Sequence, residues 1–138
     1  MKGNTLISRL MTPTPLALGP DESARRAREV MLEHGVHHLP IVSGGRFVGL
    51  VSTNDLHRIA LGDPYRDDPE LVAQDLELFP LQEVMTEDVV TLQATATVRD
   101  AALQLAKGSF HAIPILNGDA LAGIVTSTDL VAYLIEDE

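Results

Sequence analysis

Apolar residues recur at helical spacing in two long segments of the chain, residues 21–34 and residues 97–107. Polar and charged residues occupy the remaining positions of both segments, so each predicts a helix with one buried face. Gly35 and Gly108 follow the two segments, as is common where a helix ends. The predicted buried faces consist of Ala24, Ala27 and Met31 in the first helix and of Val98, Ala101, Ala102 and Leu105 in the second.

Short apolar runs typical of β-strands follow each of these helices in the same order. In each half of the chain, two such runs flank a turn that contains glycine, which predicts a β-hairpin. An extended segment precedes each long helix, and a second helix follows each hairpin. Each half therefore has the predicted order β-α-β-β-α, which is an α/β fold. The predicted strands cover residues 14–18, 38–42, 46–51, 89–92, 113–116 and 120–125, and the second helices cover residues 53–61 and 127–135.

The two halves are copies of one repeat. When residues 7–56 are aligned with residues 81–130 without a gap, identical residues occur in every predicted element. The most complete match lies between residues 49–56 and residues 123–130. A repeat of about 50 residues buries too little surface to be stable alone, so we expect the two copies to pack together.

The repeat divides the chain into three parts. We assign residues 1–61 to repeat 1, residues 62–80 to a linker and residues 81–138 to repeat 2. Two Asp-Pro steps in the linker interrupt regular structure, and residues 70–79 could form a short helix. We interpret the linker as a tether rather than as a third domain.

Composition narrows the classes of partner and chemistry. The chain has 138 residues, of which 45% are hydrophobic, enough for a compact domain with a core. Its net charge of −10 argues against nucleic acid or an anionic membrane as the main partner. The absence of cysteine excludes disulfides, thiolate metal sites and thiol nucleophiles. No apolar run is long enough for a membrane span or a signal peptide, which predicts a cytoplasmic protein.

Residues 49–56 and 123–130 each join the end of a strand to the start of a helix. Such a junction offers unpaired backbone N–H groups and hydroxyls, which suit a phosphate, and one carboxylate, which suits the hydroxyls of a ribose. The same residues could instead form plain capping boxes, in which each carboxylate only closes the helix start. The residues concerned are Ser52 with Asp55 and Thr126 with Asp129.

Other kinds of chemistry find little support in the sequence. It contains no P-loop, no Gly-x-Ser-x-Gly motif and no Ser-x-x-Lys motif, so we predict no catalytic residues and no enzymatic activity. A zinc site built from His34, His37, His38 and His111 is conceivable, but no acid or cysteine completes a ligand set in the sequence. We therefore predict no metal site.

Three motifs, each present twice and in the same order, give the chain a family likeness. They are the opening Met-Thr, a His-x-h-Pro-h strand in which h is aliphatic, and the closing Gly-h-h-Ser/Thr-x-x-Asp-Leu. On these motifs the chain resembles, over nearly its whole length, a tandem cystathionine-β-synthase-type (CBS) domain pair, or Bateman module. The resemblance implies two β-α-β-β-α repeats packed with pseudo-two-fold symmetry around a ligand cleft. It also implies sensing of adenosyl compounds such as AMP, ADP, ATP or S-adenosylmethionine.

The resemblance implies two composite sites, each joining the ribose-binding Asp of one repeat to the adenine pocket of the other. His37 and His111 stand where relatives carry a basic residue that can reach phosphate. His38 adds a second basic group beside His37, which favours the Asp129 site for a more phosphorylated ligand. One site comprises Leu50, Ser52, Asn54, Asp55, Val89, Val90, Phe110, His111, Ala112 and Pro114, and the other comprises Pro15, Leu16, Val36, His37, His38, Pro40, Ile124, Thr126, Thr128 and Asp129.

We therefore expect a stand-alone regulatory module that binds an adenosyl ligand in the inter-repeat cleft and signals to a partner protein. It requires no cofactor besides this regulatory ligand. We also expect a homodimer formed through the second helices, with Leu56, Ile59, Leu130 and Leu134 as contributors. The alternative is a structural dimerisation module that binds no ligand.

Overall fold

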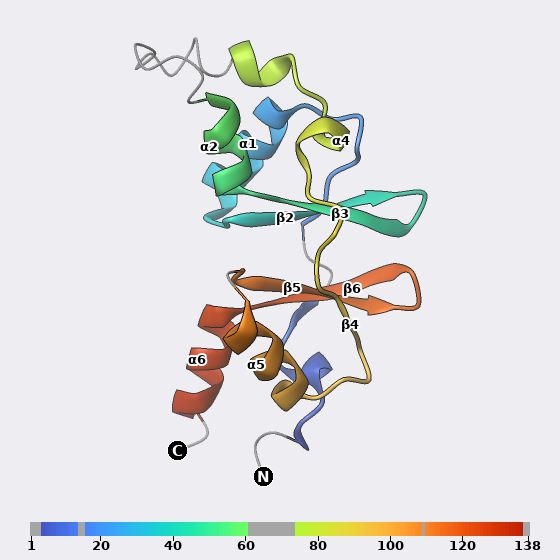
Figure 1. Ribbon diagram of the computed structural model, residues 1–138, viewed down its shortest axis with the longest axis vertical. Helices are drawn as coiled ribbons and strands as arrows, with labels where there is room; N and C mark the ends of the chain where they lie inside the picture. Colours follow the sequence, from blue (N-terminus) through green and yellow to red (C-terminus); the bar gives the residue numbers. More distant parts are fainter. Residues whose placement is uncertain (1–3, 14–15, 61–73, 109, 137–138) are drawn as a thin grey trace. The chain divides into compact units, whose positions relative to one another are not determined.

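A computed structural model describes residues 4–13, 16–60, 74–108 and 110–136 (Figure 1). Helices and strands alternate in two related sets, which confirms the predicted α/β fold class. The chain forms two compact units, one made of Leu16–Asp88 and the other of Met1–Pro15 together with Val89–Glu138. We name them the Asp55 unit and the Asp129 unit, after the carboxylate that each contains.

The Asp55 unit is built on an antiparallel hairpin of strands β2 and β3, in which Leu39 lies opposite Val51. Helices α1, α2 and α4 all lie on the same side of this hairpin (Figure 1). Leu18, in the predicted extended segment, forms a parallel bridge with Ile41 of β2. The elements of this unit are α1 (Ala24–His34), β2 (His38–Ser43), β3 (Arg46–Ser52), α2 (Thr53–Ala60) and α4 (Leu81–Val84).

The Asp129 unit repeats this plan with a sheet of order β1-β6-β5-β4, in which β4 runs parallel to β5. Helices α5 and α6 lie on the same side of the β5–β6 hairpin (Figure 1). Only Leu92 and Gln93 pair with β5, so the strand predicted over residues 89–92 begins three residues too early and ends one residue too soon. The elements are the 3₁₀ helix η2 (Ile7–Arg9), β1 (Thr12–Pro13), β4 (Leu92–Gln93), α5 (Val98–Lys107), β5 (Ala112–Asn117), β6 (Ala120–Thr126) and α6 (Ser127–Glu136).

Helix α1 begins later than the sequence predicts, because Ser23 caps it. The Ser23 hydroxyl accepts a hydrogen bond from the Arg26 backbone N–H at 3.1 Å, and the backbone of Ser23 is extended. Glu22 lies before the helix, where its carboxylate accepts from the backbone N–H of Gly19 at 2.6 Å. The helix ends as predicted at Gly35, whose φ of 64° favours glycine.

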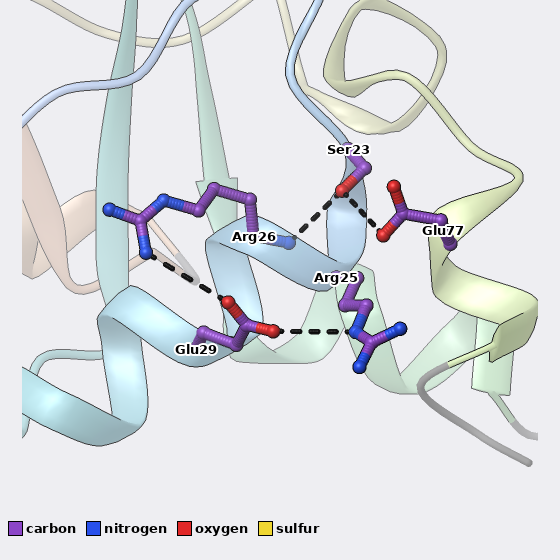
Figure 2. Close-up of polar contacts among 5 residues, drawn as sticks. All are labelled: Ser23, Arg25, Arg26, Glu29 and Glu77. Atoms are coloured by element: carbon purple, nitrogen blue, oxygen red, sulfur yellow. Dashed lines mark hydrogen bonds and ion pairs between the residues drawn. The ribbon is translucent and has the colours of Figure 1, made fainter. Parts of the chain in front are cut away.

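Figure 2 shows the polar contacts at this helix start. Glu29 pairs with Arg25 at 3.3 Å and with Arg26 at 3.9 Å, all on the exposed side of α1. The Ser23 hydroxyl also donates to Glu77 at 3.3 Å. Glu77 belongs to residues 74–77, which are helical; residues 70–73 of the predicted linker helix lie outside the described part of the chain. The end of the linker is thereby joined to α1.

The two sequence repeats exchange their opening segments. Met85 and Thr86 open repeat 2 in sequence, yet Thr86 exchanges two backbone hydrogen bonds with Leu50 of the Asp55 unit, at 2.9 and 3.0 Å. Thr12, which follows Met11 at the opening of repeat 1, pairs in the same way with Ile124 of the Asp129 unit. The compact units therefore have different boundaries from the sequence repeats.

Each exchanged methionine lies against the glycine that begins a signature. A Cβ atom at Gly49 would lie 2.6 Å from Met85 Sδ, and one at Gly123 would lie 2.5 Å from Met11 Sδ. These distances are well inside van der Waals contact, so only glycine lets the methionine approach this closely. The packing gives a physical reason for both the opening Met-Thr and the Gly of each signature.

Each unit has its own hydrophobic core, and the exchanged segments contribute to both. Leu81 of α4 is fully buried among the core residues of the Asp55 unit, as Ile7 of η2 is in the Asp129 unit. Leu76, from the end of the linker, is 1% exposed and belongs to the first of these cores. Among the helices that the structure describes, none combines the length and apolar character that crossing a bilayer requires.

Candidate functional site

Asp55 lies at the start of α2 and is a buried residue, 6% exposed as a whole. Its Oδ2 accepts hydrogen bonds from the backbone N–H of Ser52 at 2.8 Å and from the Ser52 hydroxyl at 3.0 Å. The backbone N–H of Asp55 donates back to the Ser52 hydroxyl at 3.2 Å. This reciprocal pair is a capping box, which confirms that interpretation of the first signature.

Asp129 occupies the same position at the start of α6. Its Oδ2 accepts from the backbone N–H of Thr126 at 2.8 Å, and its own N–H donates to the Thr126 hydroxyl at 3.2 Å. The capping box of the second signature is therefore also formed. A capping box uses one oxygen of each carboxylate, so it leaves the role of the second oxygen open.

The second oxygen distinguishes the two carboxylates. Asp55 Oδ1 forms an ion pair with the Arg58 guanidinium, which comes from the next turn of α2. The Arg58 side chain is 71% exposed, whereas that of Asp55 is 8% exposed. Ala132 stands where Arg58 stands in the repeat, and within the described residues Asp129 Oδ1 has no hydrogen-bond or ionic partner. Of these two carboxylates, only that of Asp129, a half-buried residue, has an oxygen without a partner among the described residues.

A backbone hydrogen bond ties each helix start to the motif histidine of its own unit. The N–H of Thr53 donates to the carbonyl of His37 at 3.0 Å, and the N–H of Ser127 donates to the carbonyl of His111 at 2.9 Å. Both of these histidines are exposed. The histidine backbone thus holds the helix start while the imidazole remains accessible beside it.

A pocket of about 580 Å³ lies beside Asp55, entirely within the Asp55 unit. Helix α2 forms one wall, and the exchanged opening segment of repeat 2 forms the other. Its volume falls within the range of small-molecule sites, roughly 300–1,000 Å³. The lining residues are Asp55, Arg58 and Ile59 from α2, and Phe79, Glu83, Val84, Met85 and Thr86 from the facing segment.

Among these lining residues, the sequence predicts only Asp55 to bind a ligand. The contact between Asp55 and Arg58 could have been predicted, since oppositely charged residues three apart on a helix are neighbours. The facing wall of the pocket could not have been predicted, because nothing in the sequence indicates that the opening of repeat 2 packs on the second helix of repeat 1. The pocket is therefore a product of the segment exchange.

The equivalent region of the Asp129 unit has different side chains. By the repeat alignment, Tyr133 replaces Ile59, Thr5 replaces Phe79 and Arg9 replaces Glu83. The Tyr133 hydroxyl donates to the Thr5 hydroxyl at 2.8 Å, which ties α6 to the N-terminal segment. A polar bridge therefore joins the two walls where the Asp55 unit has two apolar side chains.

Each unit holds one half of each predicted composite site. Within each hairpin, residues assigned to different sites lie directly opposite one another, as His38 does to Ser52 and Ala112 does to Thr126. Pro40 and Pro114 are fully buried, and Val36 and Phe110 pack against the cores of their units. The Asp55 unit contains Leu16, Val36, His37, His38, Pro40, Leu50, Ser52, Asn54 and Asp55; the Asp129 unit contains Val89, Val90, Phe110, His111, Ala112, Pro114, Ile124, Thr126, Thr128 and Asp129; Pro15 lies outside the described residues.

The histidines do not gather into a metal site in the part of the chain that the structure covers. Within those residues, no group of three or more His, Cys, Asp or Glu side chains lies close enough to hold a metal ion. At the two helix starts the described residues offer carboxylates, hydroxyls, one arginine, backbone groups and the exposed imidazoles of His37 and His111.

Comparison with protein families gives two matches along the chain. The model of the CBS domain matches residues 7–62 and again residues 81–136. A homoserine O-acetyltransferase from Methanocorpusculum labreanum is 33% identical over 123 residues, which is 88% of this chain and 22% of that protein. The chain spans about a fifth of the length of the first curated relatives it matches.

Solved structures of similar fold cover nearly the whole chain. A Vibrio cholerae protein proposed to be the acetoin utilization protein AcuB superposes with a TM-score of 0.82 at 26% identity, covering 96% of this chain and 92% of that one. CBSX2, solved in complex with AMP, gives a TM-score of 0.82 at 23% identity, covering 96% and 98%. The CBS domain pair of protein MJ0100, solved with 5′-methylthioadenosine and S-adenosyl-L-methionine, gives 0.78 at 23% identity, covering 98% and 99%.

Proposed function

Because the chain belongs to the CBS domain family and carries the domain twice, we propose that it is a regulatory module that binds adenosyl compounds. The observation that carries the proposal is the pair of capped carboxylates at the starts of α2 and α6. Each is fixed through one oxygen, and at Asp129 the second oxygen is available as an acceptor. A ribose presents two adjacent hydroxyl donors, which match such an acceptor.

We assign each ribose-binding carboxylate to a composite site that draws its adenine pocket from the other repeat. Asp55 would act with Val89, Val90 and Ala112. Asp129 would act with the apolar residues Pro15, Leu16, Val36 and Pro40. Small and apolar side chains of this kind suit the faces of an adenine ring, while nearby backbone groups suit its edge. The imidazoles of His37 and His111 are exposed, and we assign them to the phosphate of the ligand.

Ligands bound by proteins of similar fold support this assignment. CBSX2 was solved with AMP, and the MJ0100 domain pair with 5′-methylthioadenosine and S-adenosyl-L-methionine. All three ligands contain an adenosyl group with a ribose diol, but they differ in charge at the 5′ position. The diol is therefore the shared feature that a capped carboxylate would recognise.

The regulatory output follows from a ligand that bridges two repeats. Such a ligand stabilises one relative orientation of the repeats over others, and a partner protein can respond to that orientation. We also propose a cytoplasmic homodimer that forms through the second helices. Val131, Leu134 and Ile135 of α6 support this, since their exposed fractions are 57%, 55% and 69%, whereas Leu56 of α2 belongs to a core.

A thermal-shift screen of AMP, ADP, ATP, S-adenosylmethionine and 5′-methylthioadenosine tests the function. A ligand that binds only the folded state stabilises it by ~2.7 kcal/mol at a hundred times Kd, which raises Tm measurably. We expect a saturable shift from at least one of these compounds, reduced in Asp129→Asn. Asn keeps an acceptor for the capping box, so loss of binding in this variant is not loss of the helix start.

The competing function is a structural dimerisation module without a ligand. The capping boxes favour it, because they give both carboxylates a structural role whether or not a ligand binds. A flat screen on folded, ligand-free protein would exclude the adenosyl sensor and favour this alternative.

A further inference from the structure

The Asp55–Arg58 ion pair lies on the wall of the 580 Å³ pocket, and both partners line it. Resting on the proposed function, we infer that Arg58 makes the Asp55 site selective for adenosyl ligands that carry a phosphate. Arg58 acts by exchanging partners. The ribose diol replaces Arg58 as the partner of the Asp55 carboxylate, and the ligand phosphate replaces Asp55 as the partner of the Arg58 guanidinium.

The first half of this exchange follows from the hydrogen bonds of Asp55. Ser52 occupies Oδ2 and Arg58 occupies Oδ1, so a diol that binds Oδ1 competes with the guanidinium. The Arg58 side chain is 71% exposed, so water can solvate the guanidinium once the diol displaces it from the buried Asp55 carboxylate. The released guanidinium remains tethered three residues from the bound ribose.

The second half follows from the charges around the pocket. Among the described residues that line it, only Arg58 carries a positive charge, whereas Asp55 and, on the facing wall, Glu83 are negative. A ligand phosphate is an anion that a guanidinium can bind with two parallel hydrogen bonds. A ligand without phosphate, such as adenosine, offers the released arginine no new partner, and the sulfonium of S-adenosylmethionine adds a like charge.

The Asp129 carboxylate has no equivalent arginine on its own helix. Ala132 replaces Arg58, so no guanidinium stands one helical turn from the carboxylate, and Asp129 Oδ1 needs no displacement. Arg9 replaces Glu83 on the opposite segment and is exposed. The ion pair therefore assigns phosphate selectivity to the Asp55 site, whereas the histidines alone favour the Asp129 site for the more phosphorylated ligand.

Calorimetric titration with AMP and adenosine, which differ only in the phosphate, tests the inference. The Asp129→Asn background isolates the Asp55 site. In this background we expect AMP to bind more tightly than adenosine, and Arg58→Ala to weaken AMP about ten- to a hundred-fold. Adenosine should bind Arg58→Ala as well as before or more tightly, because its diol no longer competes with the guanidinium. A purely structural role would change both ligands in the same direction.

Ala132→Arg in the Asp55→Asn background is the matched control, since it places an arginine one turn from Asp129. We expect it to strengthen AMP relative to adenosine. The inference is overturned if Arg58→Ala changes the affinities for AMP and adenosine equally. It is also overturned if AMP does not bind in the Asp129→Asn background. In both cases the proposed function still stands at Asp129. Absence of binding by either ligand to the unmodified protein, together with a flat thermal screen, overturns both.

Discussion

The Asp55 unit and the Asp129 unit share the same backbone arrangement and differ in side chains near the carboxylate. In both, a glycine admits a methionine, a hydroxyl and a carboxylate cap a helix, and a histidine carbonyl holds the first helical N–H. The differences lie at Arg58 against Ala132 and at Ile59 against Tyr133. The two units thus share these backbone contacts and caps. They differ at the carboxylate oxygen that the capping box leaves unused, Oδ1 of Asp55 and of Asp129.

The glycine contacts offer the strongest test of the shared frame, because both units depend on them. An added Cβ at Gly123 would meet the Thr12 carbonyl oxygen at 2.8 Å as well as Met11 Sδ, whereas at Gly49 all three nearest atoms belong to the Met85 side chain. A backbone oxygen cannot move aside as a methionine can. We expect Gly123→Ala to lower the free energy of unfolding by ~1–3 kcal/mol and Gly49→Ala by less, measured by urea unfolding followed by circular dichroism.

The control for this prediction is to shorten the methionine. Met85→Ala combined with Gly49→Ala should be less destabilising than the sum of the two single changes, because each relieves the other. Strict additivity would mean that the close contact does not limit the glycine.

Each capping box should stabilise its own unit, the one at Ser52 more than the one at Thr126. Ser52→Ala and Thr126→Ala each remove the hydroxyl that accepts from the N–H of Asp55 or Asp129. We expect losses of ~0.5–2 kcal/mol in unfolding free energy for each, with the loss from Ser52→Ala the larger because its hydroxyl also donates to Asp55 Oδ2 at 3.0 Å. A larger loss from Thr126→Ala would contradict the hydrogen-bond pattern described above.

The polar bridge of the Asp129 unit is the smallest of the expected effects. Tyr133→Phe removes the hydroxyl that donates to Thr5 and keeps the ring. The expected loss is ~0.5–1.5 kcal/mol of unfolding free energy, with earlier proteolysis of the N-terminal segment. The matched variant Ile59→Val, at the equivalent apolar position, should change stability without affecting that segment. Unchanged proteolysis in Tyr133→Phe would show that the bridge does not hold the N-terminus.

The features that sequence predicted here are those that local patterns determine. The helical spacing of Ala24, Ala27 and Met31, the glycine turns and the capping box of Thr126 with Asp129 all depend on residues close in sequence. The start of α1 was misplaced because two acids before Ser23 resemble a helical first turn. Local competition between adjacent capping residues decides such boundaries.

The features that sequence did not predict depend on contacts between distant segments. That Met85 packs against Gly49 cannot be inferred from either residue alone, since the pairing joins the opening of one repeat to the signature of the other. The pocket beside Asp55 follows from that pairing. The ion pair between Arg58 and Asp55 is a local feature, because the two residues are three apart on one helix. That both residues line a pocket depends on contacts with a distant segment.

The most direct test of the central claim is a double-mutant cycle between the Asp129 carboxylate and the ribose diol. Calorimetry would compare adenosine with 2′,3′-dideoxyadenosine, on a protein with the Asp55→Asn change and on the same protein with Asp129→Asn added. If Asp129 Oδ1 accepts from the diol, removing the diol weakens binding about ten- to a hundred-fold when Asp129 is present and has little effect when it is replaced. Equal losses in the two proteins would show that the carboxylate does not bind the ribose and serves only to cap α6.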